Sequence, residues 1–222
     1  MENIKLVNIS KQYNGRHGFV TALKNINLQV NSGEFISITG HSGSGKSTLM
    51  NIIGLLDTAS EGEYYLMGEN VKTFGDKKIS QIRNLNIGFI FQDFNLIDNL
   101  TAYQNTMLPL LYRNLKQSER ISRTKNALKQ VGLLYRSEHL PSELSGGQRQ
   151  RAAIARVIAA SPPIVLADEP TGNLDPEKRD EILNIFSDFS NEGKTVIIIT
   201  HDQKVANRTN RQIKICDGEL KG

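Results

Sequence analysis

The sequence lacks tryptophan, contains a single cysteine and carries no long apolar run. The one cysteine, Cys216, excludes a disulfide framework or a thiolate metal site within the chain, and its apolar neighbours predict a buried, inert thiol. The strongest apolar run near the end, Val196 to Ile199, is far shorter than the roughly 20 residues that a membrane-spanning helix needs. We therefore expect that the chain forms no pore by itself and that a transport role requires a separate membrane protein.

Neither sign of charge dominates: 27 lysines and arginines face 23 acidic residues, a net charge of +4. So small an excess favours a mixed, solvated surface over a basic patch, and no nucleic-acid partner is predicted. Residues 1–10 lack a basic segment followed by an apolar core, so we expect no secretory signal. A reducing cytoplasmic setting agrees with the single cysteine.

A length of 222 residues is sufficient for one sizeable α/β domain with a smaller lobe. Apolar runs predict strands at 4–9, 23–30, 34–39, 63–67, 87–91, 164–167 and 196–199, with an edge strand at 211–215. Helical spacing predicts helices at 49–56, 101–131, 148–160 and 176–190. Asp175 is the expected N-cap of the last of these, and Pro109 is expected to kink or break the second.

The segment GHSGSGKST fits the phosphate-loop pattern G-x-x-x-x-G-K-[ST] at every fixed position, between a predicted strand and a predicted helix. Glycines let main-chain N–H groups turn toward one anion, and the helix adds its positive N-terminal end. Lys46 is predicted to reach the β- and γ-phosphates, and the Ser47 hydroxyl to ligate Mg²⁺. The predicted nucleotide-binding residues of this loop are Gly40, His41, Ser42, Gly43, Ser44, Gly45, Lys46, Ser47 and Thr48. An incidental glycine-rich turn, the alternative, leaves the complete pattern unexplained.

Two carboxylates end a predicted buried strand in the run IVLADE, residues 164–169. Ligands bind at the carboxyl ends of strands in open α/β sheets. Asp168 is predicted to hold Mg²⁺ through its water shell, and Glu169 to polarise an attacking water as general base. A pair of solvated loop acids is the alternative, which the neighbouring phosphate loop disfavours.

Three further residues carry weaker signals. His201 follows another buried strand and is a candidate for contacting the γ-phosphate, although a lone histidine at a strand end is usually structural. Gln92 follows the strand at 87–91 and is a candidate for bridging Mg²⁺ or the attacking water. Tyr13 has two interpretations: its ring stacks on a purine, or it belongs to the core. The spacing of Tyr13 from the other motifs does not distinguish between these two roles.

A second phosphate-binding pattern lies at LSGGQ, residues 144–148. Ser145 is a natural helix N-cap, Gly146 and Gly147 allow close approach to the backbone, and the helix from Gln148 adds another positive N-terminus. One nucleotide scarcely needs two such helix ends from one chain, so we expect this end to serve the nucleotide of a second copy across a two-fold interface. An ordinary serine-capped helix, the alternative, does not account for the double glycine.

Together these motifs resemble, in identity and order, those of the ATP-binding-cassette (ABC) ATPases: GHSGSGKST, Gln92, LSGGQ, IVLADE, the Asn173-Leu174-Asp175 turn and His201. The resemblance covers essentially the whole chain. It implies an α/β fold: a phosphate-loop NTPase core with a mostly parallel sheet, an N-terminal antiparallel β subdomain and an inserted α-helical subdomain. One ABC ATPase domain then spans residues 1–222, with the core at about 1–92 and 160–222 and the helical subdomain at about 93–159.

The resemblance implies an ATP-hydrolysing enzyme with ATP and Mg²⁺ as cofactors. The implied catalytic residues are Glu169 as base, His201 as switch, Lys46 and Gln92, and the implied metal ligands are Ser47, Gln92 and Asp168. It further implies an ATP-dependent head-to-tail homodimer, with each ATP between the phosphate loop of one subunit and LSGGQ of the other. The residues implied to bind the nucleotide outside the phosphate loop are Tyr13 (adenine), Gln92, Ser145, Gly146, Gly147, Gln148, Asp175 (between subunits) and His201.

Three longer stretches are similar to the macrolide-exporter and lipoprotein-release branch of that family: residues 89–112, 140–151 and 166–175. That similarity implies a cytoplasmic subunit, peripheral on the inner face of the cell membrane, bound to a permease with few transmembrane helices. It admits an extracytoplasmic adaptor and leaves antimicrobial peptide, macrolide and lipoprotein open as cargo. His41 and Arg149 depart mildly from the usual pattern, and neither removes a catalytic group.

Other functions remain as rivals. The ATPase of the cell-division complex shares much of the signature and acts on cell-wall hydrolysis rather than transport. A cassette that acts on DNA or ribosomes usually carries coiled-coil, zinc or tandem-cassette features that do not fit in 222 residues. A simple phosphate-loop kinase leaves LSGGQ unexplained. Four apolar residues close to Gln92 in the sequence predict either a groove for the permease or internal packing: Phe91, Phe94, Leu96 and Leu100.

Overall fold

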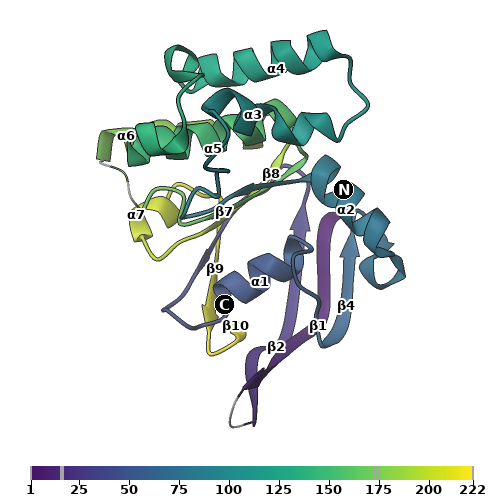
Figure 1. Cartoon of the computed structure of the whole chain (residues 1–222). Coiled ribbons are helices and arrows are strands. Elements are labelled where there is room, and N and C mark those ends of the chain that lie inside the picture. Colours follow the sequence, from purple (N-terminus) through teal and green to yellow (C-terminus); the bar gives the residue numbers. More distant parts are fainter. Residues whose placement is uncertain (1, 16–17, 173, 175, 222) are drawn as a thin grey trace.

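A computed structural model describes residues 2–15, 18–172, 174 and 176–221, and it contains two sheets and helices on both sides of the larger one (Figure 1). The smaller sheet is antiparallel, in the order β2-β1-β4-β5, with bounds Gly18–Asn31, Glu2–Gly15, Glu61–Leu66 and Glu69–Asn70. The larger sheet has the order β10-β9-β3-β8-β7-β6, with bounds Glu219–Lys221, Arg211–Cys216, Phe35–Thr39, Thr195–Ile199, Ile164–Asp168 and Ile87–Ile90. Its strands pair in parallel except for β10, which confirms the predicted mostly parallel core and the antiparallel β subdomain.

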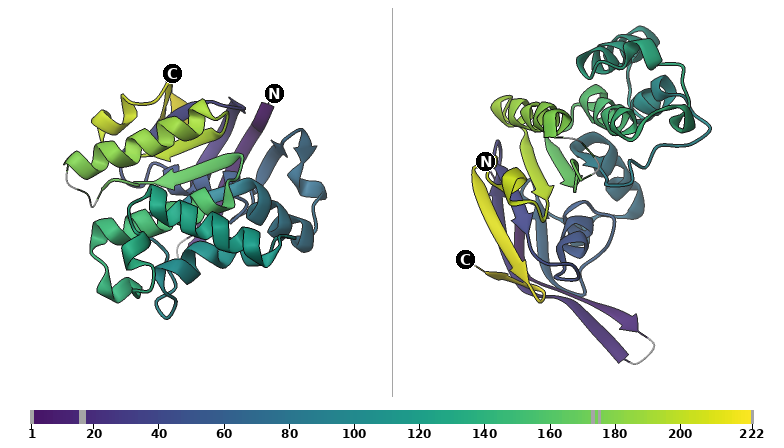
Figure 2. Two further views of the ribbon diagram at one scale, coloured as in Figure 1. Left: turned by 90° about the horizontal axis from the view of Figure 1, so that it is seen from above. Right: turned by 90° about the vertical axis from the view of Figure 1, so that its left-hand side faces the viewer.

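The central strands of the parallel sheet, β3, β8 and β7, are buried on both faces, and alternate residues of each point to opposite sides. Ile197 and Ile199 of β8 join a core that the sheet shares with α1, Lys46–Ile53, and with the antiparallel sheet. Val196 and Ile198 join a second core on the other face. That face carries α3, Ala102–Leu111, α4, Gln117–Gln130, α5, Gly146–Ala160, and α6, Pro176–Asn191. Helix α1 therefore lies between the two sheets, and the helical region lies beyond the parallel sheet (Figures 1 and 2).

Several elements differ from their predicted extent. Strands β1 and β2 continue past the predicted 4–9 and 23–30 into a long hairpin that projects from the chain (Figure 2). Ser10 and Lys11 are still buried, whereas residues 12–14 and 18–21 are exposed, Tyr13, Phe19 and Val20 among them, so no buried face marks the outer part of the hairpin. The predicted helical block at 101–131 is two helices, and α3 ends two residues after Pro109.

Among the described residues, the sequence analysis missed two helices and two short strands, β5 and β10. Helix α2, Asp76–Asn86, has no fully buried residue: Ile79 and Ile82 are half-buried against the core, so its apolar stripe is short. Helix α7, Gln203–Ala206, is a single turn. The strand predicted as an edge, β9, is covered by β10, which pairs with it through the tight turn at Asp217 and Gly218. Cys216 was expected to be buried but is only half-buried. None of the described helices is long and apolar enough to span a membrane.

Candidate nucleotide site

The phosphate loop follows β3 and ends on the first turn of α1, as its motif requires. Two of its glycines are fixed by close packing: a Cβ on Gly40 would lie 2.3 Å from the main-chain oxygen of Ile215, and one on Gly45 would lie 2.6 Å from that of Ala22. Gly45 also has a φ of +105°, which favours glycine. These positions let the backbone curve tightly in front of α1.

The loop contains polar groups that are available to bind an anion. Helix α1 has no side-chain cap at its N-terminus, so its first N–H groups lack the partner that a capping side chain supplies. The Ser44 hydroxyl is buried and has no hydrogen-bond partner among the described residues. Lys46 donates from Nζ to the carbonyl oxygens of Gly40 (2.9 Å) and His41 (2.8 Å), so its ammonium group lies inside the loop. Backbone amides, a buried hydroxyl and an ammonium group fit a phosphate chain.

The other predicted residues of the loop have distinct positions. Ser42, Gly43 and Ser47 are exposed, and Ser47 lies in the first turn of α1 beside Lys46. The His41 side chain points to the turn between β9 and β10. Thr48 interacts with the hydroxyl of Tyr13.

The two acids lie at the carboxyl end of β7, where Glu169 has a φ of +43°, uncommon for a residue with a side chain. The side chain of Glu169 is only 13% exposed and accepts three hydrogen bonds from the segment after β8. These come from the main-chain N–H of His201 (2.9 Å), the imidazole Nδ1 of His201 (2.6 Å) and the hydroxyl of Thr200 (3.1 Å). A carboxylate held this way has a fixed orientation, as a general base requires.

Burial raises the pKa of Asp168, the adjacent Glu169 carboxylate raises it further, and the ammonium group of Lys46 acts in the opposite direction. Asp168 therefore interacts electrostatically with both Glu169 and Lys46, which relates the phosphate loop to the end of β7. The oxygen donors of Asp168, Ser47 and Gln92 form the kind of set that Mg²⁺ prefers. When bound, Mg²⁺ neutralises charge on the phosphates of the nucleotide.

Gln92 follows β6 and lines a small crevice together with Glu169, Gln150 and Phe94. The structure thus brings Gln92 to the predicted general base, although the two are far apart in the sequence. Gln150, which the sequence analysis did not select, is buried and donates to the carbonyl oxygen of Pro170, 2.8 Å away. This bond ties α5 to the segment that follows the two acids.

Tyr13 lies on β1 with its ring half exposed, and its hydroxyl donates to Asp57 (2.7 Å). Burial and this bond raise the pKa of Tyr13, while its interaction with Thr48 lowers it. Lys11 also bonds Asp57 (2.6 Å), and its ammonium group lies 4.9 Å from the centre of the Tyr13 ring. An exposed ring beside the phosphate loop agrees with stacking on a base rather than with a core role.

The LSGGQ residues form the start of α5, away from the phosphate loop of the same chain (Figures 1 and 2). Ser145 and Gln148 form a capping box: the Ser145 hydroxyl accepts from the main-chain N–H of Gln148 (3.3 Å), and the Gln148 side chain accepts from that of Ser145 (2.9 Å). Gly146 has open space where a side chain would project. Among the described residues, no hydrogen bond or ion pair joins residues 145–148 to residues 40–48.

Two predicted features lie outside the described residues: Asn173, and Asp175 with its predicted roles as N-cap and inter-subunit contact. Thr200, by contrast, is a residue that the sequence analysis missed, since it orients Glu169 and also accepts from the main-chain N–H of Asp202 (3.0 Å). Its place between a buried strand and His201 is the only sequence signal that marks it. Asp57, the partner of Tyr13 and Lys11, carried no such signal.

Fold and site together define a phosphate-loop ATPase, and comparison with known proteins identifies its family. The model of the ABC transporter family matches residues 23–172. The chain is 50% identical over 217 residues to an ABC transporter ATP-binding protein of Bacillus subtilis, YvrO, covering 98% of this chain and 95% of that one. It is 44% identical over 220 residues to the macrolide export ATP-binding/permease protein MacB of Mannheimia succiniciproducens, covering 99% of this chain and 34% of MacB.

A solved structure agrees closely. The dimeric structure of an ATP-binding cassette in a post-hydrolysis state, bound to ADP and Pi, superposes with a TM-score of 0.93 at 44% identity, covering 99% of this chain and 97% of that chain. The chain therefore belongs to the ABC transporter family. It is an ATP-hydrolysing cassette related to the ATP-binding part of MacB, with ATP and Mg²⁺ as its cofactors.

Replacing Glu169 with Gln is expected to abolish ATP turnover while ATP binding persists, because an amide keeps the size of the side chain but removes the basic oxygen. Steady-state phosphate release and equilibrium binding of labelled ATP measure the two effects. Glu181→Gln, an exposed change on α6, is the matched control and should leave both unchanged. Undiminished turnover in the Glu169 variant would remove Glu169 from the role of base.

Replacing Asp168 with Asn is expected to raise the thermal unfolding midpoint near neutral pH. The raised pKa means that folding opposes ionisation of Asp168, so stability is lost as pH rises from the unfolded-state pKa through the folded-state pKa. The advantage of the variant should shrink near pH 4, about the unfolded-state pKa, where the wild-type side chain is largely protonated. Thermal unfolding at both pH values tests this, with the exposed Asp188→Asn as control. A lower midpoint for Asp168→Asn at neutral pH would contradict it.

Proposed function

We propose that the chain works as a head-to-tail homodimer in which each ATP lies between the phosphate loop of one copy and the LSGGQ segment of the other. The observation that carries this proposal is the separation, within one chain, of two anion-binding helix ends. The start of α5 is capped by its own serine and has open space at Gly146, yet it has no described contact with the phosphate loop. The solved relative, which is a dimer, supports the proposal.

The proposed role is to drive export or extrusion through a separate membrane permease with few transmembrane helices. The similarity to a macrolide export ATP-binding/permease protein supports this branch, because this chain corresponds to about a third of that protein. The cargo is then an antimicrobial peptide, a macrolide or a lipoprotein, and an extracytoplasmic adaptor is a further partner of such a complex. The subunit would lie on the cytoplasmic face of the cell membrane. Regulation of cell-wall hydrolysis in a cell-division-type complex is the second candidate, and co-purification of a cell-wall hydrolase would favour it.

A groove of about 1000 Å³ beside Gln92 is the proposed docking site for the permease. Phe89 and Phe91 stack at its base, with ring centres 5.3 Å apart. Exposed apolar side chains from three other segments surround them: Leu56, Leu85 and Tyr112. Of the four residues considered for this role from the sequence, only Phe91 lines the groove.

The other three residues have different surroundings. Leu96 packs against the helical core, Phe94 lies against Arg149 with 5.3 Å between the guanidinium carbon and the ring centre, and Leu100 is half-buried. Because Phe91 directly precedes Gln92, a rearrangement of Gln92 around the nucleotide would reach the groove through one peptide unit. We propose that residues 93–159 move as the helical subdomain in this step.

The dimer proposal predicts complementation between two inactive variants. Lys46→Ala disables the phosphate loop, and Ser145→Arg fills the LSGGQ end with a bulky side chain. A mixed dimer of the two retains one intact site, so an equimolar mixture should regain up to about a quarter of the wild-type ATPase rate. Phosphate release by each variant alone and by the mixture measures this. Sites completed within one chain would give no recovery in the mixture.

The docking proposal predicts that Tyr112→Asp lowers co-purification of the permease about tenfold or more, because a charge is placed in an apolar contact. Tyr135→Asp is the matched control, since Tyr135 is 70% exposed against 78% for Tyr112 but lies outside the groove. The measurement is recovery of the membrane protein encoded beside this chain, after co-expression in membranes. Equal recovery with both variants would place the docking surface elsewhere. The ATPase rate of the isolated chain should not change.

A further inference from the structure

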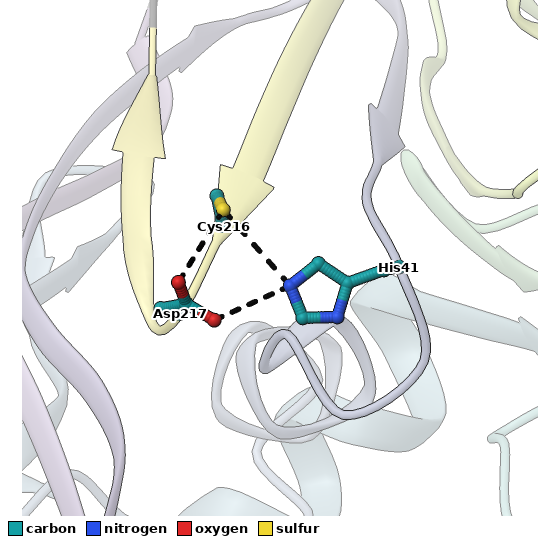
Figure 3. A group of neighbouring side chains, drawn as sticks. All are labelled: His41, Cys216 and Asp217. Atoms are coloured by element: carbon teal, nitrogen blue, oxygen red, sulfur yellow. Dashed lines mark hydrogen bonds and ion pairs between the residues drawn. The ribbon is translucent and has the colours of Figure 1, made fainter.

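Three metal-ligating side chains meet behind the phosphate loop: His41 from that loop, Cys216 from the end of β9 and Asp217 from the turn before β10 (Figure 3). Main-chain bonds hold the two segments together. The N–H of Gly218 donates to the carbonyl oxygen of Ser44 (3.0 Å), and the N–H of Lys24 donates to that of Gly218 (2.8 Å). The cluster is thus built on a fixed junction between the phosphate loop and the β9–β10 turn.

The distances between the three side chains fit a metal ion. His41 Nε2 lies 3.3 Å from Asp217 Oδ1 and 3.9 Å from Cys216 Sγ, and Cys216 Sγ lies 3.6 Å from Asp217 Oδ2. Zinc bonds of roughly 2.0–2.3 Å at tetrahedral angles separate sulfur, nitrogen and oxygen ligands by about 3.3–3.6 Å. The nearest distances lie within a few tenths of an ångström of these, with one Asp217 oxygen facing His41 and the other facing Cys216.

The orientation of the imidazole also suits coordination. His41 Nδ1 lies 2.8 Å from the carbonyl oxygen of Ser42, which only accepts hydrogen bonds, so the hydrogen is on Nδ1. That tautomer leaves the lone pair of Nε2 directed at Cys216 and Asp217 (Figure 3). A backbone carbonyl that fixes the other ring nitrogen is a common feature of metal-binding histidines.

From this geometry we propose that His41, Cys216 and Asp217 bind a zinc ion that cross-links the phosphate loop to the β9–β10 turn. One thiolate, one imidazole and one carboxylate select a borderline ion such as Zn²⁺ over Mg²⁺, which prefers oxygen ligands. The site is therefore chemically distinct from the magnesium site at Asp168. It revises the expectation from the cysteine count, because a single thiolate is sufficient when the other ligands come from different side-chain types.

The site is open to solvent: the side chains of His41 and Asp217 are 56% and 78% exposed. Three protein ligands leave a fourth tetrahedral position for water. An exposed three-ligand site binds an exchangeable ion rather than one locked into the fold. Without a metal, the same His41–Asp217 contact would be only a surface ion pair, which contributes little to stability.

Cobalt titration tests the site directly, because Co²⁺ replaces Zn²⁺ in tetrahedral sites and a thiolate ligand gives it a charge-transfer band in the near ultraviolet. Cys216 is the only cysteine, so this band can arise from no other residue. The wild-type chain, kept with a non-thiol reductant, should show a band that saturates at one Co²⁺ per chain and is bleached by Zn²⁺. A band that never forms, or that does not saturate at that ratio, overturns the proposal.

Matched variants show whether the three side chains coordinate the metal ion or merely lie close to one another. Cys216→Ser should abolish the band, and Asp217→Asn should weaken Co²⁺ binding about tenfold or more, because the amide is a poor metal ligand. His139→Gln, which removes a histidine far from the cluster, should bind like the wild type. An unchanged affinity in Asp217→Asn would overturn the proposed ligand set.

Thermal unfolding gives a readout that is independent of spectroscopy. Zinc that binds only the folded chain raises the unfolding midpoint in proportion to the logarithm of its concentration. The wild-type chain should show this rise, and Cys216→Ser should not. An equal rise in both proteins would show binding elsewhere and overturn the assignment.

Discussion

Hydrogen-bonded pairing of three parallel strands, β3, β8 and β7, decides where the chemistry of this chain lies. Ile38 pairs with Ile199, and Ile199 pairs with Asp168, so the three strands end side by side. Two main-chain bonds continue the pairing past the strands: Thr200 N–H to Ile38 oxygen (3.2 Å) and Glu169 N–H to Ile199 oxygen (2.9 Å). One end of the sheet, formed by the carboxyl ends of these strands, therefore carries the phosphate loop, the two acids and His201. Shifting any of these strands by one residue would turn its apolar side chains to the wrong core and separate these groups.

Negative charge exceeds positive charge among the ionisable side chains Asp168, Glu169 and Lys46 at this end of the sheet. Two adjacent carboxylates, one of them largely buried from solvent, face a single ammonium group at Lys46. Glu169 is compensated by hydrogen bonds from Thr200 and His201, whereas Asp168 has a raised pKa. A divalent cation held by Asp168 would relieve the repulsion that folding leaves at this carboxylate. This is the usual trade-off in which a functional site holds groups that cost stability.

Motifs whose chemistry depends on adjacent residues were predictable from the sequence. The phosphate loop, the IVLADE strand and the capped start of α5 are each contained in a short segment, and each folds as its local pattern indicates. Contacts between distant segments were not predictable. The bond from Thr200 to Glu169, the crevice shared by Gln92 and Glu169, and the approach of Cys216 to His41 all depend on strand order. Helix α2 was missed because only Ile79 and Ile82 pack against the core and no residue of the helix is fully buried, so its apolar stripe is short.

The same strand order places two structural elements against opposite sides of the nucleotide site. On one side β6 leads through Phe91 to Gln92, with Phe89 and Phe91 stacked at the base of an open apolar groove. On the other side the β9–β10 turn backs the phosphate loop, where Ile215 leaves no room for a side chain on Gly40. The groove side is open to solvent and is bounded by the exposed helix α2. The β9–β10 turn is instead held in place by main-chain hydrogen bonds. A nucleotide-dependent movement would therefore be transmitted toward the groove, with the β9–β10 turn as the fixed support against which it acts.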